Sequence, residues 1–192
     1  DLLRLYFYLH LSLKMNHLEQ LTILLTLKDR NKFTYRWLKY MEQEKCPFHI
    51  YIADGGSNDE VSEHINNKYS ESSLNITYVK TEFDSSLKIF YRKIMNALDS
   101  INTPYVVRAD NDDFFSIEAL QESLQFLEEN SDYVSCGGGV IHFSINGDRT
   151  HRKNVIFDKE KDVESYIDGK SINRLKQYFQ LGSGVYYNIN MT

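Results

Sequence analysis

The sequence predicts an α/β fold with a Rossmann-like, mostly parallel sheet and helices on both faces. Apolar runs of strand length alternate with segments of helical periodicity, which is typical of βαβ units. The run LTILLTL, residues 21–27, is almost continuously apolar, as in a strand that is buried on both faces of a parallel sheet. Three predicted strands end in polar clusters, and ligands of such sheets bind beyond the carboxyl ends of the strands.

The first predicted strand covers residues 21–27, and a helix follows over residues 34–43 with its apolar residues on one face. The second strand covers residues 48–53 (FHIYIA) and ends in the polar run DGGS. Ser57 and Glu60 have the spacing of a capping box, which predicts a helix that begins at Ser57. Its apolar positions would be Val61, Ile65 and Tyr69.

The third strand is predicted over residues 75–80, and the helix that follows over residues 86–101. One stripe of that helix carries Leu87, Tyr91, Ile94, Leu98 and Ile101. The fourth strand covers residues 105–109, and Ser116 would cap the next helix. Strand-like runs over residues 133–143 and 185–189 complete the predicted sheet.

Composition narrows the class of protein. The chain has 192 residues, 42% of them hydrophobic, which suits one α/β domain with a core and excludes global disorder. The net charge of −5 gives no general attraction for nucleic acid, so we expect no nucleic-acid partner and at most a peripheral membrane association. The two cysteines exclude a disulfide framework and favour a cytoplasmic protein, at the inner face of the membrane as one alternative.

The N-terminal segment is apolar but is interrupted by Arg4 and His10, and it is shorter than the roughly 18 residues of a membrane span. Met15 begins a run that resembles a natural bacterial N-terminus. We therefore expect residues 1–14 to be an extension outside the core, and residues 15–192 to form a single domain. An amphipathic helix that packs on the domain is the alternative for residues 1–14.

Three polar clusters are expected at one edge of the sheet, because parallel strands end on the same side. They comprise residues 26–30, 54–57 and 110–113. Asp110, Asp112 and Asp113 repel one another unless a cation offsets their charge, and Mg2+ binds such oxygens together with substrate phosphates. The alternative is that they only cap a helix or form a turn.

Asp54 stands at the end of a strand, before two glycines, where a carboxylate can accept a hydrogen bond from a base or a ribose hydroxyl. The glycines would allow the backbone to turn and a ligand to approach closely. An ordinary turn is the alternative for the DGGS run taken alone.

Taken together, these motifs resemble those of family-two glycosyltransferases of the GT-A fold, over residues 20–130. The matching residues are Thr26, Asp29 and Arg30 after the first strand, Asp54, Gly56 and Ser57 after the second, and Asp110, Asp112 and Asp113 after the fourth. The resemblance implies a metal-dependent, inverting transfer of a sugar from a nucleotide-sugar, with a UDP-sugar favoured, to a glycan or lipid-linked acceptor of polysaccharide biosynthesis.

The resemblance also implies roles for single residues. Thr26 and Asp29 would line the base pocket, and Asp54 would read the base. Arg30 and Gly56 would also belong to the donor-binding site. Asp110 and Asn111 would lie near the ribose or the donor sugar. Asp112 would bind Mg2+ or Mn2+ with support from Asp113, and the ion would stabilise the departing diphosphate.

The chain departs from the family pattern in its C-terminal part. The resemblance implies a general base, an acidic residue after the last strand, and no residue up to Thr192 matches it. We therefore expect the general base beyond Thr192. On this interpretation the chain is a C-terminally truncated enzyme in which residues 131–192 form an incomplete acceptor part.

A second departure concerns the helix before the fourth strand, which lacks the usual Ala-Arg-Asn stretch of the family. Arg92 and Lys93 could add positive charge there. We favour the other interpretation, in which both residues lie on a solvated helix face.

Two other functions compete with glycosyl transfer. A sugar nucleotidyltransferase would be expected to have a glycine-rich basic loop after its first strand, but the run LKDRNKF contains no glycine. A non-catalytic nucleotide- or sugar-binding module remains open because the general base is not matched. The histidines and cysteines lack metal-ligand spacing, so a zinc site and a cysteine nucleophile are not expected.

Overall fold

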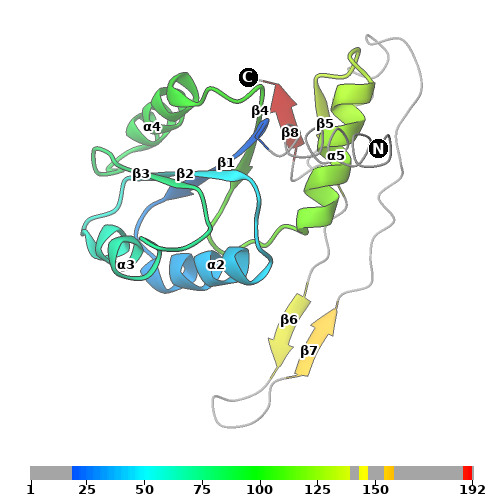
Figure 1. Ribbon diagram of the computed structural model, residues 1–192. Helices are drawn as coiled ribbons and strands as arrows, with labels where there is room; N and C mark the ends of the chain where they lie inside the picture. Colours follow the sequence, from blue (N-terminus) through cyan, green and yellow to red (C-terminus); the bar gives the residue numbers. More distant parts are fainter. Residues whose placement is uncertain (1–18, 139–142, 147–153, 158–187, 192) are drawn as a thin grey trace. The chain divides into compact units, whose positions relative to one another are not determined.

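The computed structural model describes residues 19–138, 143–146, 154–157 and 188–191, and it contains the predicted α/β sheet (Figure 1). The strand order is β3-β2-β1-β4-β8-β5. The strands are β1 (Leu21–Leu27), β2 (His49–Asp54), β3 (Ile76–Lys80), β4 (Tyr105–Ala109), β5 (Ser135–Gly137) and β8 (Asn188–Met191). The helices are α2 (Asn31–Gln43), α3 (Glu60–Lys68), α4 (Leu87–Ser100) and α5 (Ile117–Glu129).

Four adjacent strands of this sheet are parallel, with β1 at their centre between β2 and β4. Leu25 of β1 is in register with Ile52 on one side and with Ala109 on the other. Strand β8 is antiparallel to β4. The chain leaves β3 at one side and re-enters at β4 on the other side of β1. In sheets of this kind a crevice for ligands lies where the strand order reverses.

The helices cover the two faces of the sheet (Figure 1). Helix α4 lies on one face, where Ala97 and Ile101 pack against Leu24, Ala53 and Val106. Helices α2 and α3 lie on the other face, and α2 buries its apolar side completely with Trp37, Leu38 and Met41. This double burial explains why β1 is apolar at every position except Thr22 and Thr26.

The chain divides into two compact units, residues 1–136 with 189–192, and residues 137–188. Within the described residues of the second unit, β6 (Phe143–Asn146) and β7 (Asn154–Phe157) pair as an antiparallel hairpin. Phe143 is in register with Phe157.

The predicted fold class is confirmed, and β1 and β4 have their predicted bounds. The predicted capping box is wrong: α3 begins at Glu60, and Ser57 instead bonds Asp29 in another loop. The predicted cap Ser116 is confirmed, since its side chain accepts a hydrogen bond from the backbone N–H of Ala119. Ser86, for which no cap was predicted, caps α4 in the same way through Ile89. The strand expected over residues 133–143 is shorter, because β5 ends at Gly137.

Of the last predicted strand, residues 188 and 189 lie in β8, which spans Asn188–Met191. Residues 1–14, residues 185–187 and Thr192 lie outside the described part of the chain, so the expectations for them stay predictions. This holds also for the general base expected beyond Thr192, because the described residues end at Met191 and nothing in the structure tests that position.

Helix α4 differs from its predicted pattern. Leu87, Tyr91 and Leu98 of the predicted stripe are exposed, whereas Lys93 is buried. The helix therefore turns a face with a charged residue towards the sheet, which periodicity of apolar residues does not reveal.

Candidate functional site

The loops after β1 and β2 are joined at the carboxyl edge of the sheet. Asp29 Oδ1 accepts hydrogen bonds from the backbone N–H of Ser57 at 2.7 Å and from its hydroxyl at 2.8 Å. These two bonds, the backbone one first, lower the pKa of the Asp29 carboxyl below its ordinary value of 3.8. Asp29 and Arg30 both have positive φ, 55° and 58°, which non-glycine residues adopt rarely. Strained backbone of this kind is concentrated at functional sites.

Asp54 ends β2 and is almost completely buried, with 2% of its surface exposed. Its Oδ1 accepts from the backbone N–H of Gly56 at 2.7 Å, and its Oδ2 accepts from the Tyr78 hydroxyl at 2.7 Å. Burial and the bond to Asp54 raise the pKa of Tyr78, so the phenol remains a donor. Each carboxylate oxygen can accept more than one hydrogen bond, so capacity for a ligand remains.

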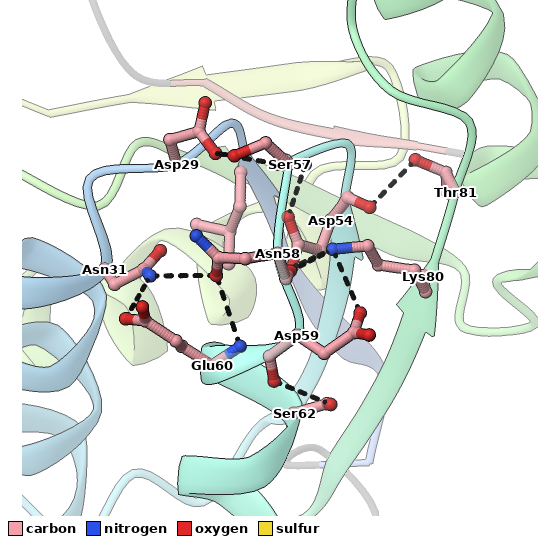
Figure 2. A network of polar contacts seen from close by, with 12 residues as sticks. Asp29, Asn31, Asp54, Ser57, Asn58, Asp59, Glu60, Ser62, Lys80 and Thr81 are labelled. Carbon is pink, nitrogen blue, oxygen red and sulfur yellow. Dashed lines mark hydrogen bonds and ion pairs between the residues drawn. The ribbon is translucent and has the colours of Figure 1, made fainter.

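Lys80 supplies a positive charge close to Asp54, with 3.6 Å between its Nζ and Asp54 Oδ2 (Figure 2). The same Nζ lies 3.5 Å from Asp59 and donates to the backbone oxygen of Asn58. Lys80 therefore holds the residues that follow β2 against the end of β3. A buried carboxylate needs a partner of this kind, because an unpaired charge in the interior is costly.

Two glycines permit this close approach of the loops. A Cβ on Gly56 would lie 2.8 Å from Asp54 Oδ1 and 3.0 Å from the backbone nitrogen of Asp29. A Cβ on Gly55 would lie 2.4–2.6 Å from the carboxylate atoms of Asp84. The space beside both glycines is already filled by polar groups, so a side chain at either position displaces the neighbouring loop.

The loop after β4 joins the same site through two contacts. Arg30 donates to Asp112 Oδ2 at 2.8 Å, and both side chains remain partly exposed. Asn111 is buried, and its amide donates to Thr34 of α2 at 3.0 Å. This loop is thus anchored by a buried amide and by an ion pair at the surface.

The other two carboxylates of this loop lie closer to solvent. Asp110 Oδ2 is 3.4 Å from a guanidinium nitrogen of Arg108, and both side chains are about half exposed. Asp113 is exposed. The carboxylates of the loop therefore face outwards or towards a cation, where a ligand can reach them.

The structure brings together most residues that the sequence singled out. Asp29, Gly56 and Ser57 are in contact, and Arg30 is paired with Asp112. Thr26 is buried at the end of β1, and its hydroxyl has no hydrogen-bond partner within the described part of the chain. A buried hydroxyl without a partner requires an explanation, and a ligand or water supplies one.

The aspartates after β4 fit a divalent ion of the kind that bridges phosphates. Among the described residues, no group of three or more His, Cys, Asp or Glu converges as a complete metal cage. Asp112, however, presents a partly exposed carboxylate, and the partner that it has is the exposed cation Arg30. Mg2+ typically takes one or two carboxylates and completes its shell with waters and substrate phosphates. The residues present therefore fit a metal that is held jointly with a ligand.

Sequence reasoning missed the contribution of β3. Tyr78 and Lys80 contact Asp54, and Asp84 in the following loop contacts Lys93. The expectation that Lys93 lies on a solvated helix face is wrong, because it is 3% exposed, whereas Arg92 is half exposed beside Glu82. The available signal was the run KTEFD over residues 80–84, which places four polar residues at a strand end.

No helix among the described residues is long and apolar enough to span a membrane. A family model described as "Glycosyl transferase family 2" matches residues 23–188. No curated protein sequence matches the chain.

Solved structures that resemble the chain include two proteins. A mannosyltransferase from Pyrobaculum calidifontis, in complex with GDP-Man and Mn2+, has a TM-score of 0.50 and 15% identity over 60% of this chain and 34% of its own. TarS from S. aureus, residues 1–349, has a TM-score of 0.49 and 19% identity over 58% of this chain and 33% of its own. The matched part of the chain thus spans about a third of the length of these structures. The first likeness shows a shared fold.

Proposed function

The chain belongs to glycosyl transferase family 2, and on that premise we propose that it carries the donor-binding part of a glycosyltransferase that uses a nucleotide-sugar. One observation carries the proposal. Side-chain contacts join the loops after β1, β2 and β4 at the carboxyl edge of a parallel sheet, Asp29 to Ser57 and Arg30 to Asp112. That edge is where nucleotides bind in sheets of this topology.

The assigned roles follow the chemistry of each group. Thr26 has a buried hydroxyl without a hydrogen-bond partner among the described residues, and Asp29 has a second carboxylate oxygen, so both would line the base pocket. Arg30 and Gly56 would belong to the same donor site. Asp54 is held by Tyr78 and would accept a hydrogen bond from the base.

The loop after β4 would contact the sugar part of the donor. Asp110 would lie near the ribose or the donor sugar, since its carboxylate is half exposed at the end of β4. Asn111 would keep this loop in place through its hydrogen bond to Thr34.

Asp112 would hold Mg2+ or Mn2+, with Asp113 in support. When bound, the ion would supply Lewis-acid stabilisation of the charge that develops on the departing diphosphate. Arg30 now neutralises Asp112 through a contact that is exposed, and exposed ion pairs contribute little free energy. The guanidinium can therefore exchange this carboxylate for the diphosphate at small cost, and Arg side chains suit phosphate geometry.

The donor class is a nucleoside diphosphate sugar, and we favour a UDP-sugar. The mannosyltransferase that shares the fold is described with GDP-Man and Mn2+, which makes a GDP-sugar the second donor to test. We further propose inversion at the transferred carbon and a glycan or lipid-linked acceptor, in the cytoplasm or at the inner face of the membrane. We assign the general base of this transfer to none of these residues.

Calorimetry on the chain tests the proposal. UDP, UDP-sugars and GDP-Man are titrated with and without Mn2+ against the wild type, Asp112→Asn and the control Asp99→Asn, which changes an exposed carboxylate of α4. We expect binding that needs Mn2+, that Asp112→Asn weakens at least about tenfold, and that Asp99→Asn leaves unchanged.

Two outcomes contradict parts of the proposal. Binding that does not depend on Mn2+ or on Asp112 would refute the metal assignment while leaving a nucleotide-binding module. The absence of binding for every nucleotide and nucleotide-sugar would refute the donor-binding function itself.

A further inference from the structure

A buried ion pair lies directly beneath the donor-binding loops. Lys93 of α4 and Asp84 of the loop after β3 are each 3% exposed, and Lys93 Nζ contacts Asp84 Oδ2. The same Nζ donates to the backbone oxygen of Leu27, the last residue of β1, at 2.7 Å. A single ammonium group therefore connects α4, the end of β1 and the loop after β3.

The backbone on either side of Asp84 extends this connection to the other loops. The N–H of Asp84 donates to the oxygen of Gly55 at 3.0 Å, and the N–H of Gly55 donates to the oxygen of Leu27 at 3.0 Å. Lys28, which follows β1, donates to the backbone oxygen of Asp84 at 2.6 Å. The ends of three parallel strands thus meet at one charged pair.

Stability alone is a poor explanation for this pair. Desolvating two charges costs about as much as their attraction returns, so apolar residues of similar volume are often equally stable in their place. The pair is also incomplete, because Asp84 Oδ1 is buried and has no hydrogen-bond partner among the described residues. The Lys93–Asp84 pair binds the ends of the loops while Asp84 Oδ1 stays without a hydrogen bond. Such a pair is better suited to position the loops than to stabilise the core.

The pair occupies the same face of the sheet as Thr26. Thr26 lies two residues after Leu24 in β1, so the two side chains share a face, and Thr26 is in register with Ala53 of β2. Leu24 and Ala53 both belong to the apolar cluster that α4 covers. Lys93 lies one helical turn before Ala97, which belongs to that cluster. Two buried polar atoms that lack a hydrogen bond within the described ranges, Thr26 Oγ1 and Asp84 Oδ1, therefore lie on the α4 face of the sheet, near its carboxyl edge.

We propose that Lys93 and Asp84 are positioning residues of the donor site, and this inference rests on the proposed function. The Lys93 ammonium holds both Leu27 and the Asp84 carboxylate, and the backbone N–H of Asp84 in turn bonds Gly55. Through this chain of contacts the pair sets the distance between the loop that carries Asp29 and the loop that carries Asp54. The positive charge of Lys93 is used inside the protein, by Asp84, and does not serve as a phosphate ligand.

The test compares removal of one partner with replacement of both. Lys93→Met leaves Asp84 unpaired and is expected to lower the thermal midpoint. The double variant Lys93→Met, Asp84→Leu replaces the pair by apolar groups and is expected to recover most of that loss. Lys88→Met, at an exposed lysine of the same helix, serves as the matched control.

Affinity then separates a positioning role from a structural one. With the recovered double variant, binding of UDP or GDP in the presence of Mn2+ is expected to stay at least about tenfold weaker than in the wild type, or about 1.4 kcal/mol. An affinity that recovers together with the thermal midpoint would overturn the inference, since the pair would then only stabilise the fold.

Amide hydrogen exchange gives a readout that does not depend on a nucleotide. In the double variant we expect faster exchange at the N–H groups of Gly55 and Ser57, which bond Leu27 and Asp29, and unchanged exchange in α5. If the wild type binds no nucleotide, the proposed function is wrong. The exchange rates of the Gly55 and Ser57 amides then still test whether Lys93 and Asp84 position the loops. Unchanged exchange at Gly55 and Ser57 would overturn it.

Discussion

The hydroxyl of Tyr78 offers a sharp test of how Asp54 is held. Substitution Tyr78→Phe removes one oxygen and leaves the ring in place. That oxygen donates to Asp54 Oδ2 at 2.7 Å, and Asp54 is 2% exposed, so water does not readily replace the lost donor. After the substitution, Lys80 at 3.6 Å is the remaining partner of Oδ2 among the contacts described.

The contacts set the size of the effect. A hydrogen bond to a charged group contributes about 1.5–3 kcal/mol, and loss of one donor leaves the acceptor desolvated. Because Lys80 still partly compensates the carboxylate, we expect the lower part of this range, about 1.5–2 kcal/mol of unfolding free energy. For a domain of this size, that loss corresponds to a fall of about 3–8 °C in the thermal midpoint.

Urea unfolding followed by far-UV circular dichroism measures this loss, with Tyr91→Phe as the matched control. Tyr91 is 58% exposed on α4, so removal of its hydroxyl is expected to change the unfolding free energy by less than about 0.5 kcal/mol. Equal, small effects of the two substitutions would refute the reasoning, because they would mean that the Tyr78 hydroxyl is replaced by water.

Other positions in the same unit lead to three more tests. Gly56→Ala places a Cβ 2.8 Å from Asp54 Oδ1, so we expect weaker nucleotide binding by calorimetry. Gly138→Ala should have no effect, because its Cβ meets no atom of the described residues within 4 Å. Burial lowers the pKa of His49 below 6.5; the unfolded chain therefore takes up the proton first, and stability that is present above pH 6.5 is lost as the pH falls through the folded pKa. Urea midpoints at about pH 7.5 and 5.5 should show this loss, and His49→Gln should reduce it, whereas an unchanged pH dependence would contradict it. Burial raises the pKa of Cys46 to about 11, so iodoacetamide at neutral pH should leave it unmodified in the folded protein, and rapid labelling would show that this site opens.

Local features of the fold could be predicted from the sequence. The bounds of β1 and β4 and the cap Ser116 belong to this group, because apolar runs and capping side chains act within a few residues. The family could also be predicted, because its three motifs stand directly after strands. The match over residues 23–188 confirms that resemblance, whereas the roles of single residues and the general base expected beyond Thr192 stay predictions.

Ser57 and Lys93 show why the remainder could not be predicted. Ser57 has the spacing of a helix cap, yet its hydroxyl bonds Asp29, 28 residues away. Lys93 has the polarity of a surface residue, yet it is buried against Asp84. In both cases a contact with a residue distant in sequence outweighs the local preference for a cap or for the surface. Only the packing of loops and helices brings that distant residue close.

The sequence by itself thus determined the alternation of strands and helices and the edge of the sheet at which the polar loops meet. Hydrophobic periodicity decides these features, since it selects the face that each element buries. Only the tertiary structure decided that Tyr78 and Lys80 hold Asp54 and that Arg30 pairs with Asp112. It also decided that Lys93 of α4 contacts Asp84 in the loop after β3. The physical reason is that these contacts join residues far apart in the chain, and their distances depend on how the strands register and how α4 packs on the sheet.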